Sequence, residues 1–169
     1  MLTWTRRLIA TAAALVAMPA VAGCSVPSAG ATGVSVTADG QPLGVILMCH
    51  DHIDGATLHA DDDDPQSNDS TGRWSRTEPL SGFSTWPLAT GDDGAVDGWT
   101  AEEPLGALDP RTTYRMYGWT TDHSWASASV SFTLAELEDL TPGQVRYEIG
   151  DEVTTASIEE FRRTACDHF

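Results

Sequence analysis

The stretch that most constrains the fold is residues 108–117, Leu-Asp-Pro-Arg-Thr-Thr-Tyr-Arg-Met-Tyr, in which a Pro-containing segment runs into an alternating one. A second alternating segment follows at 126–133, where serines alternate with Ala, Val and Phe. Alternation with a period of two indicates half-buried β-strands, so we expect the two segments to pair as a hairpin. Opposed residues share a face, which predicts that Tyr114 and Met116 point to the buried side with Ala128, Val130 and Phe132.

The same hairpin predicts an aromatic surface on its other side. Tyr117, Trp119 and Trp125 fall on the side of the serines. Aromatic side chains with a polar edge on an open face suit the binding of sugars or protein partners. The alternative is that the Trp-rich middle of the chain or the last helix covers them and forms a second small core.

Leu108, Pro110, Thr112 and Tyr114, with the strand that follows them, resemble the Leu-x-Pro-x-Thr-x-Tyr corner of fibronectin type III and related immunoglobulin-like domains. The resemblance implies that the Tyr114 hydroxyl bonds back to the preceding corner while its ring packs in the core. It also implies a mainly β fold, an immunoglobulin-like β-sandwich.

Two capping boxes add helices to this sandwich. Thr133-Leu-Ala-Glu predicts a short helix between late strands, and Ser157-Ile-Glu-Glu predicts a C-terminal helix that ends at Cys166. Residues 144–149 alternate between the two helices and are expected to form a strand.

The N-terminus is typical of a secretory signal. Arg6 and Arg7 precede an apolar run from 8 to 16, and residues 21–24 read Val-Ala-Gly-Cys. This ending resembles the bacterial lipobox, which implies that a signal peptide of residues 1–23 is removed and that Cys24 is lipid-modified with acyl chains such as palmitate. Two or three chains would anchor the protein on the outer face of the bacterial cell membrane. The alternative is that Cys24 is an incidental thiol behind an ordinary cleavable signal, and the export route is open between general secretory and twin-arginine.

Once Cys24 is assigned to lipid, the resemblance leaves Cys49 and Cys166 as one pair outside the cytoplasm. Oxidising surroundings favour a disulfide between them. Residues 24–33 are small and polar, which predicts a lipidated flexible tether. Residues 34–169 are long enough for a single domain.

Two Asp-Gly pairs predict hairpin turns, Asp39-Gly40 between 34–38 and 45–49, and Asp54-Gly55 between Ile53 and Ala56. The second register assigns one core face to Val45, Leu47, Cys49, Ile53, Ala56 and Leu58. It assigns the other face to His50, His52 and His59. Three neutral imidazoles on adjacent strands could bind zinc or copper, so a metal-binding lipoprotein is the alternative function. A metal-dependent hydrolase ranks below it, because no motif supplies a Glu base.

Charge and motifs narrow the function classes. The chain has 25 acidic and 9 basic residues, no lysine, and a formal net charge of -16, which disfavours nucleic acid as a partner. Phosphate-loop, dinucleotide, Gly-x-Ser-x-Gly and Cys-x-x-Cys signatures do not occur. We therefore expect a non-catalytic, secreted and membrane-anchored binding or envelope-interaction module without a cofactor, whose partner is an envelope protein or glycan.

Overall fold

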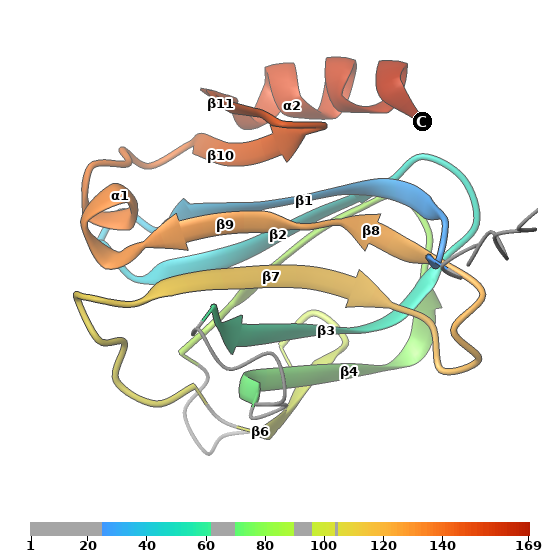
Figure 1. The fold of residues 1–169 in the computed structure, drawn as a ribbon, viewed down its shortest axis with the longest axis horizontal. Helices are drawn as coiled ribbons and strands as arrows, with labels where there is room; N and C mark the ends of the chain where they lie inside the picture. Colours follow the sequence, from blue (N-terminus) through green and yellow to red (C-terminus); the bar gives the residue numbers. More distant parts are fainter. Residues whose placement is uncertain (1–24, 62–69, 90–95, 104) are drawn as a thin grey trace, which may run out of the picture.

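The computed structural model describes residues 25–61, 70–89, 96–103 and 105–169. These residues form a mainly β, barrel-like arrangement (Figure 1). The strands are β1 (Ser28–Val36), β2 (Pro42–Met48), β3 (Ile53–Ala60), β4 (Ser70–Leu80), β5 (Phe83–Pro87), β6 (Trp99–Glu103), β7 (Thr113–Trp119), β8 (Ala126–Ala128), β9 (Val130–Thr133), β10 (Gln144–Ile149) and β11 (Glu152–Ser157). The helices are α1 (Leu134–Glu138), α2 (Ile158–Thr164) and the 3-10 turn η1 (Ala165–His168).

Strand β1 is the junction of the sheet. It pairs antiparallel with β2 and β10 and parallel with β8. From β8 and β9 the sheet continues through β7, β3 and β4 to β6, and from β2 it continues to β5. The two ends meet through side chains, because the rings of Trp86 and Trp99 stack at 4.1 Å and Trp99 Nε1 donates to Ser84 Oγ at 2.9 Å. This contact makes the arrangement barrel-like.

The predicted corner is present at the start of β7. The Tyr114 hydroxyl accepts a hydrogen bond from the Asp109 N–H at 2.7 Å, and the Tyr114 ring is buried. Tyr114 pairs with Phe132 and Met116 with Val130, which confirms the predicted hairpin. The main core behind it also contains Trp74, Trp86 and Trp99, all fully buried, so the Trp-rich middle segment fills the interior.

The alternation breaks at one place in this hairpin. Ser129 separates β8 from β9, so Ser127 turns inward while Ala128 is only half-buried. Ser127 Oγ accepts from the Gly118 N–H at 2.6 Å and hydrogen-bonds with Thr32 Oγ1. The prediction for Ala128 was wrong, because this buried hydroxyl satisfies the Gly118 N–H and Thr32.

A second hydrophobic cluster lies on the other side of β1 and β2. The β10–β11 hairpin and α2 lie along the upper side of the molecule in Figure 1, over β1. Val45 and Leu47 pack there with Tyr147 and Phe161, whereas Ile46 and Met48 face the main core. The single core face predicted for Val45, Leu47, Cys49, Ile53, Ala56 and Leu58 was therefore wrong, since both faces of β2 are covered.

Cys49 and Cys166 form the predicted disulfide, with a Cα–Cα distance of 5.3 Å across 117 residues of sequence. It joins η1 to the segment after β2. The two predicted helices are present. Thr133 and Glu136 form the capping box of α1, whereas the second predicted box shows one of its two bonds, in which Ser157 accepts from the Glu160 N–H.

The prediction of a flexible tether over 24–33 was wrong for residues 28–33. Residues 28–33 belong to β1 and are mostly buried, and the Pro27 carbonyl already accepts from the Ala126 N–H at 3.1 Å. Small residues fit here because a side chain at Gly30 or Gly33 would collide with β2 or β10. Cys24 and the leader 1–23 lie outside the described residues.

The first predicted hairpin is correct and the second is wrong. β1 and β2 pair up to Val36 and Pro42, and Gly40 adopts the positive φ of 75° that a turn glycine provides. Asp54 and Gly55 instead lie inside β3, which pairs with β4 on one side and β7 on the other. In the described residues no helix is both long and apolar enough to cross a membrane.

Candidate functional site: an aromatic pocket on the open face

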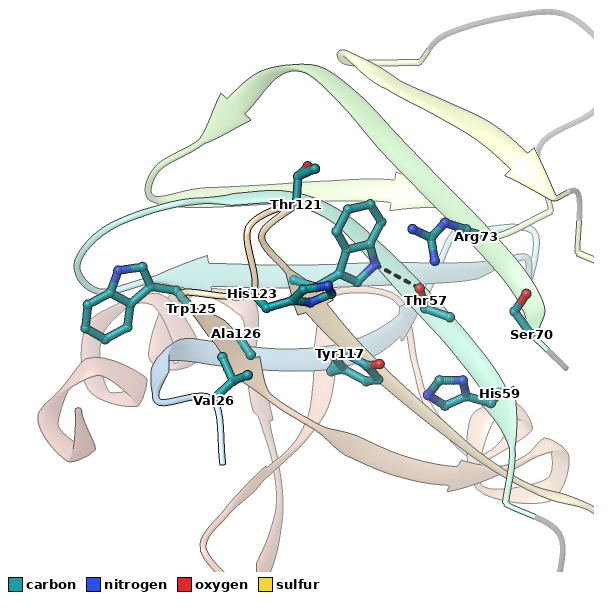
Figure 2. Close-up of a pocket in the computed structure, with 11 residues that line it drawn as sticks. Val26, Thr57, His59, Ser70, Arg73, Tyr117, Thr121, His123, Trp125 and Ala126 are labelled. Carbon is teal, nitrogen blue, oxygen red and sulfur yellow. Dashed lines mark hydrogen bonds between the residues drawn. The ribbon is translucent and has the colours of Figure 1, made fainter. Parts of the chain in front are cut away.

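A pocket of about 450 Å³ lies over β3, β4 and β7 (Figure 2). Its wall is completed by the loop 120–125, which joins β7 to β8, and by Val26 ahead of β1. The lining consists of Val26, Thr57, His59, Ser70, Arg73, Tyr117, Trp119, Thr121, His123, Trp125 and Ala126. It mixes aromatic surface with hydroxyl, imidazole and guanidinium groups.

Trp119 is held in place by the strand beside it. Gly55 of β3 is its cross-strand partner, and a Cβ atom at Gly55 would lie 2.4 Å from the indole and 2.6 Å from the Trp74 carbonyl oxygen. Trp119 Nε1 donates to Thr57 Oγ1 at 2.8 Å, the dashed line in Figure 2. The glycine is thus required for space, and Asp54-Gly55 lies within β3 and not in a turn.

Arg73 contributes the cationic part of the lining. The pairing of β3 with β4 shifts register between Leu58 and His59, and this irregularity brings Ser70 and Arg73 to the same pocket although they are three residues apart. The Arg73 guanidinium carbon lies 4.2 Å from the Trp119 ring centroid, and its Nε donates to Glu102 at 2.8 Å. Stacking and ion pairing together orient the guanidinium plane.

The loop 120–125 is fixed by its own hydrogen bonds. Buried Thr120 exchanges backbone and side-chain bonds with Trp125, and the Thr121 N–H donates to Asp54 at 2.7 Å. Asp122 accepts from the hydroxyl and the N–H of Ser124, which lowers the pKa of its exposed carboxyl to about 2. The wall that carries His123 and Trp125 is therefore organised before any ligand binds.

His59 sits half-buried on β3 with its ring centroid 5.3 Å from that of Tyr117. Burial lowers its pKa below 6.5, the positive charge of Arg115 lowers it further, and Asp61 acts in the opposite direction. Near neutral pH the imidazole is therefore mainly uncharged and can both donate and accept a hydrogen bond.

The three aromatic residues singled out in the sequence, Tyr117, Trp119 and Trp125, all line this one pocket. Each is half-buried, so the three do not form a closed second core, although Trp125 also packs against the main core. The second core belongs to β10, β11 and α2 instead.

The histidine register was wrong. His59 pairs with Ser70 and Arg115, so the predicted pairing of its strand with the segment before Asp54-Gly55 does not occur. His50 lies edge-on to Trp125 at 5.2 Å, and His52 approaches Asp54 at 3.8 Å. Within the described ranges, no three His, Cys, Asp or Glu residues are grouped so that they could hold a metal ion. Metal binding by His50, His52 and His59 stays a prediction from the sequence.

Sequence reasoning missed Thr57, Ser70 and Arg73. Thr57 comes close to Trp119 through the pairing of β3 with β7. Ser70 and Arg73 join the pocket only because β4 adds to the far edge of β3, and the local pattern of 70–80 does not reveal its partner strand. The one sequence pattern that could have indicated them is the alternation of Thr57 and His59, which places both on one face of β3. It was not recognised because Asp54-Gly55 was wrongly predicted to be a turn.

Comparison with protein-family models, with curated proteins and with solved structures finds no match to this chain.

Proposed function

We propose that this chain is a non-catalytic extracytoplasmic binding module whose aromatic pocket holds a sugar unit of an envelope glycan. The observation that carries the proposal is that Tyr117, Trp119 and Trp125 line one pocket together with polar groups. Aromatic faces pack against the apolar C–H faces of a sugar ring, and the hydroxyl and imidazole groups of Thr121 and His59 suit its hydroxyls.

Size and order support this choice. Ligand pockets usually measure about 300–1,000 Å³, so about 450 Å³ suits one or two sugar rings. Trp119 is fixed by Thr57 and Arg73, and Trp125 by the hydrogen bonds of its loop. A prepared surface of this kind loses little conformational entropy on binding.

The proposal includes an immunoglobulin-like sandwich for the fold. The Tyr114 corner supports it, as do the antiparallel pairs β2–β5, β3–β7 and β7–β9. The parallel pairing of β1 with β8 would then join the first strand to the last one of the opposite sheet. An experimentally determined structure in which β2–β5 and β3–β7 do not pack face to face would contradict this assignment.

We also propose that Cys24 anchors the domain to the outer face of the cell membrane through lipid. The Cys49–Cys166 disulfide is compatible with an oxidising compartment. Val26, which lines the pocket, is two residues from Cys24 and hence at most about 7 Å along an extended chain. An anchored domain would therefore present the pocket to glycans close to the bilayer. Mass spectrometry of native protein tests this, since an unmodified residue 24 contradicts it.

The function is tested by a glycan-binding screen of the mature, oxidised chain, followed by titration of each hit. Trp119→Ala should weaken binding about ten- to a hundredfold, the loss expected when a large aromatic side chain is removed from the centre of an interface. Phe169→Ala, at a half-exposed aromatic outside this pocket, is the matched control and should leave the affinity unchanged. Glycan binding that is equal in both variants, or absent in the native chain, contradicts the proposal.

A further inference from the structure

The geometry points to a carboxylate-bearing sugar, a uronic acid unit, as the ligand of the aromatic pocket, with Arg73 as the residue that selects it. This inference rests on the proposed glycan-binding function and names the class of glycan.

Arg73 is arranged as a carboxylate receptor. Its guanidinium plane is fixed from two directions, by Trp119 at 4.2 Å and by the Nε bond to Glu102. In the described part of the chain its two Nη nitrogens donate to no protein atom. A planar guanidinium with two unoccupied donors matches the two oxygens of a carboxylate, which it binds through parallel hydrogen bonds.

The charge of the lining supports an acidic ligand. Asp and Glu make up 25 of the 169 residues, yet the described lining contains one arginine, two histidines and no carboxylate. Two carboxylates at its edge are bonded to lining residues, Glu102 to Arg73 and Glu103 to Ser70, and Asp61 pairs with Arg115. The described lining is therefore less acidic than the chain as a whole.

A cationic sugar fits this arrangement less well. An amine placed on Trp119 would meet the guanidinium that already covers the ring, and like charges repel at that separation. A neutral sugar could stack on Tyr117 and Trp125, but it would leave the Nη donors of Arg73 without an ionic acceptor. A uronic acid satisfies both the aromatic and the cationic groups.

The test compares oligogalacturonate and oligoglucuronate with their methyl esters, which keep the sugar rings and remove the negative charge. Calorimetric titration of the mature, oxidised protein should give an affinity about ten- to a hundredfold higher for one of the acids than for its ester, as charge-assisted hydrogen bonds provide. Arg73→Gln should abolish this preference while binding of the ester persists. Arg111→Gln, which removes one positive charge outside the pocket, should retain the preference.

Equal affinity for acid and ester overturns the inference and leaves the proposed glycan binding intact. A preference for the acid that survives Arg73→Gln also overturns it, because Arg73 would not be the selecting group. Absence of binding to both acids and both esters overturns the inference, and the wider glycan screen then decides whether the proposed function fails with it. Near-UV circular dichroism of Arg73→Gln checks that the stacked Trp119 keeps its environment.

Discussion

On each of the two outer faces of this barrel-like sheet, a glycine leaves space for side chains of another segment. One face is covered by a second layer of protein, and the other is not. On β1, Gly33 has no side chain, and a Cβ there would lie 2.4 Å from the Val145 side chain of β10. On β3, Gly55 has none, and a Cβ there would lie 2.4 Å from the indole of Trp119. The space at Gly33 is filled by a second layer of protein, in which Tyr147 and Phe161 are buried. The space at Gly55 is filled by the single side chain of Trp119, and that face is open to solvent in the described residues.

This difference shows that an aromatic strand face becomes core or candidate site according to what covers it. The β1–β2 face is covered by a C-terminal layer that the disulfide holds. Among the described residues, the β3–β7 face is bordered by Ser70 and Arg73 of β4, by the loop 120–125 and by Val26. The covered face should therefore dominate stability and the open face should dominate binding.

Removal of the disulfide should have the largest effect. The bond closes 117 residues, for which the chain-entropy account gives about 4–5 kcal/mol of stability. Chemical denaturation of a Cys49→Ser/Cys166→Ser variant measures the loss. A change below about 1 kcal/mol would show that noncovalent packing alone fixes the C-terminal layer.

Phe161→Ala and Trp119→Ala compare the two faces directly. Phe161 is fully buried against Tyr147, so its truncation should cost about 3–5 kcal/mol of unfolding free energy. Trp119 is half-buried and should cost about 1–2 kcal/mol, mainly its hydrogen bond and its stacking with Arg73. Urea denaturation of both variants measures this, and equal losses would mean that the open face is as much core as the covered one.

Gly55→Ala tests the space beneath the site. The added methyl group must displace the Trp119 ring or the backbone at Trp74, an overpacking that should cost about 1–3 kcal/mol and disturb near-UV circular dichroism. Gly106→Ala is the matched control, because nothing lies within 4 Å of a Cβ there, and it should change neither property. An unperturbed Gly55→Ala would refute the account of Trp119 placement.

The pH dependence from His59 should be the smallest effect. Its pKa in the folded protein is below 6.5, so the unfolded chain takes up the proton first as pH falls. The stabilisation is complete above pH 6.5 and is lost as pH falls from 6.5 through the lowered value. Denaturation midpoints at pH values above and below this range measure the loss of stability. His59→Gln should make stability depend less steeply on pH within the range. An unchanged slope would assign the pH dependence to other groups.

Several elements of this protein were determined by local sequence. The capping residues Thr133 and Ser157 start helices because their side chains satisfy free N–H groups a few residues away. The corner before Tyr114 and the β7–β9 hairpin also depend on neighbours in the chain. The Cys49–Cys166 pairing was predicted from the expectation that Cys24 carries lipid, and this disulfide is present.

The register of β3 and the surroundings of Trp119 were decided only by the tertiary structure. An Asp-Gly pair favours a hairpin turn wherever it occurs in a sequence. At Gly55 this local preference is outweighed by packing against the indole of Trp119, 64 positions away in sequence. Likewise, alternation establishes that a strand has two different faces, but it does not say which face another layer will cover. That outcome depends on contacts between distant segments, and here it separates a buried core on β1 and β2 from an open aromatic pocket on β3 and β7.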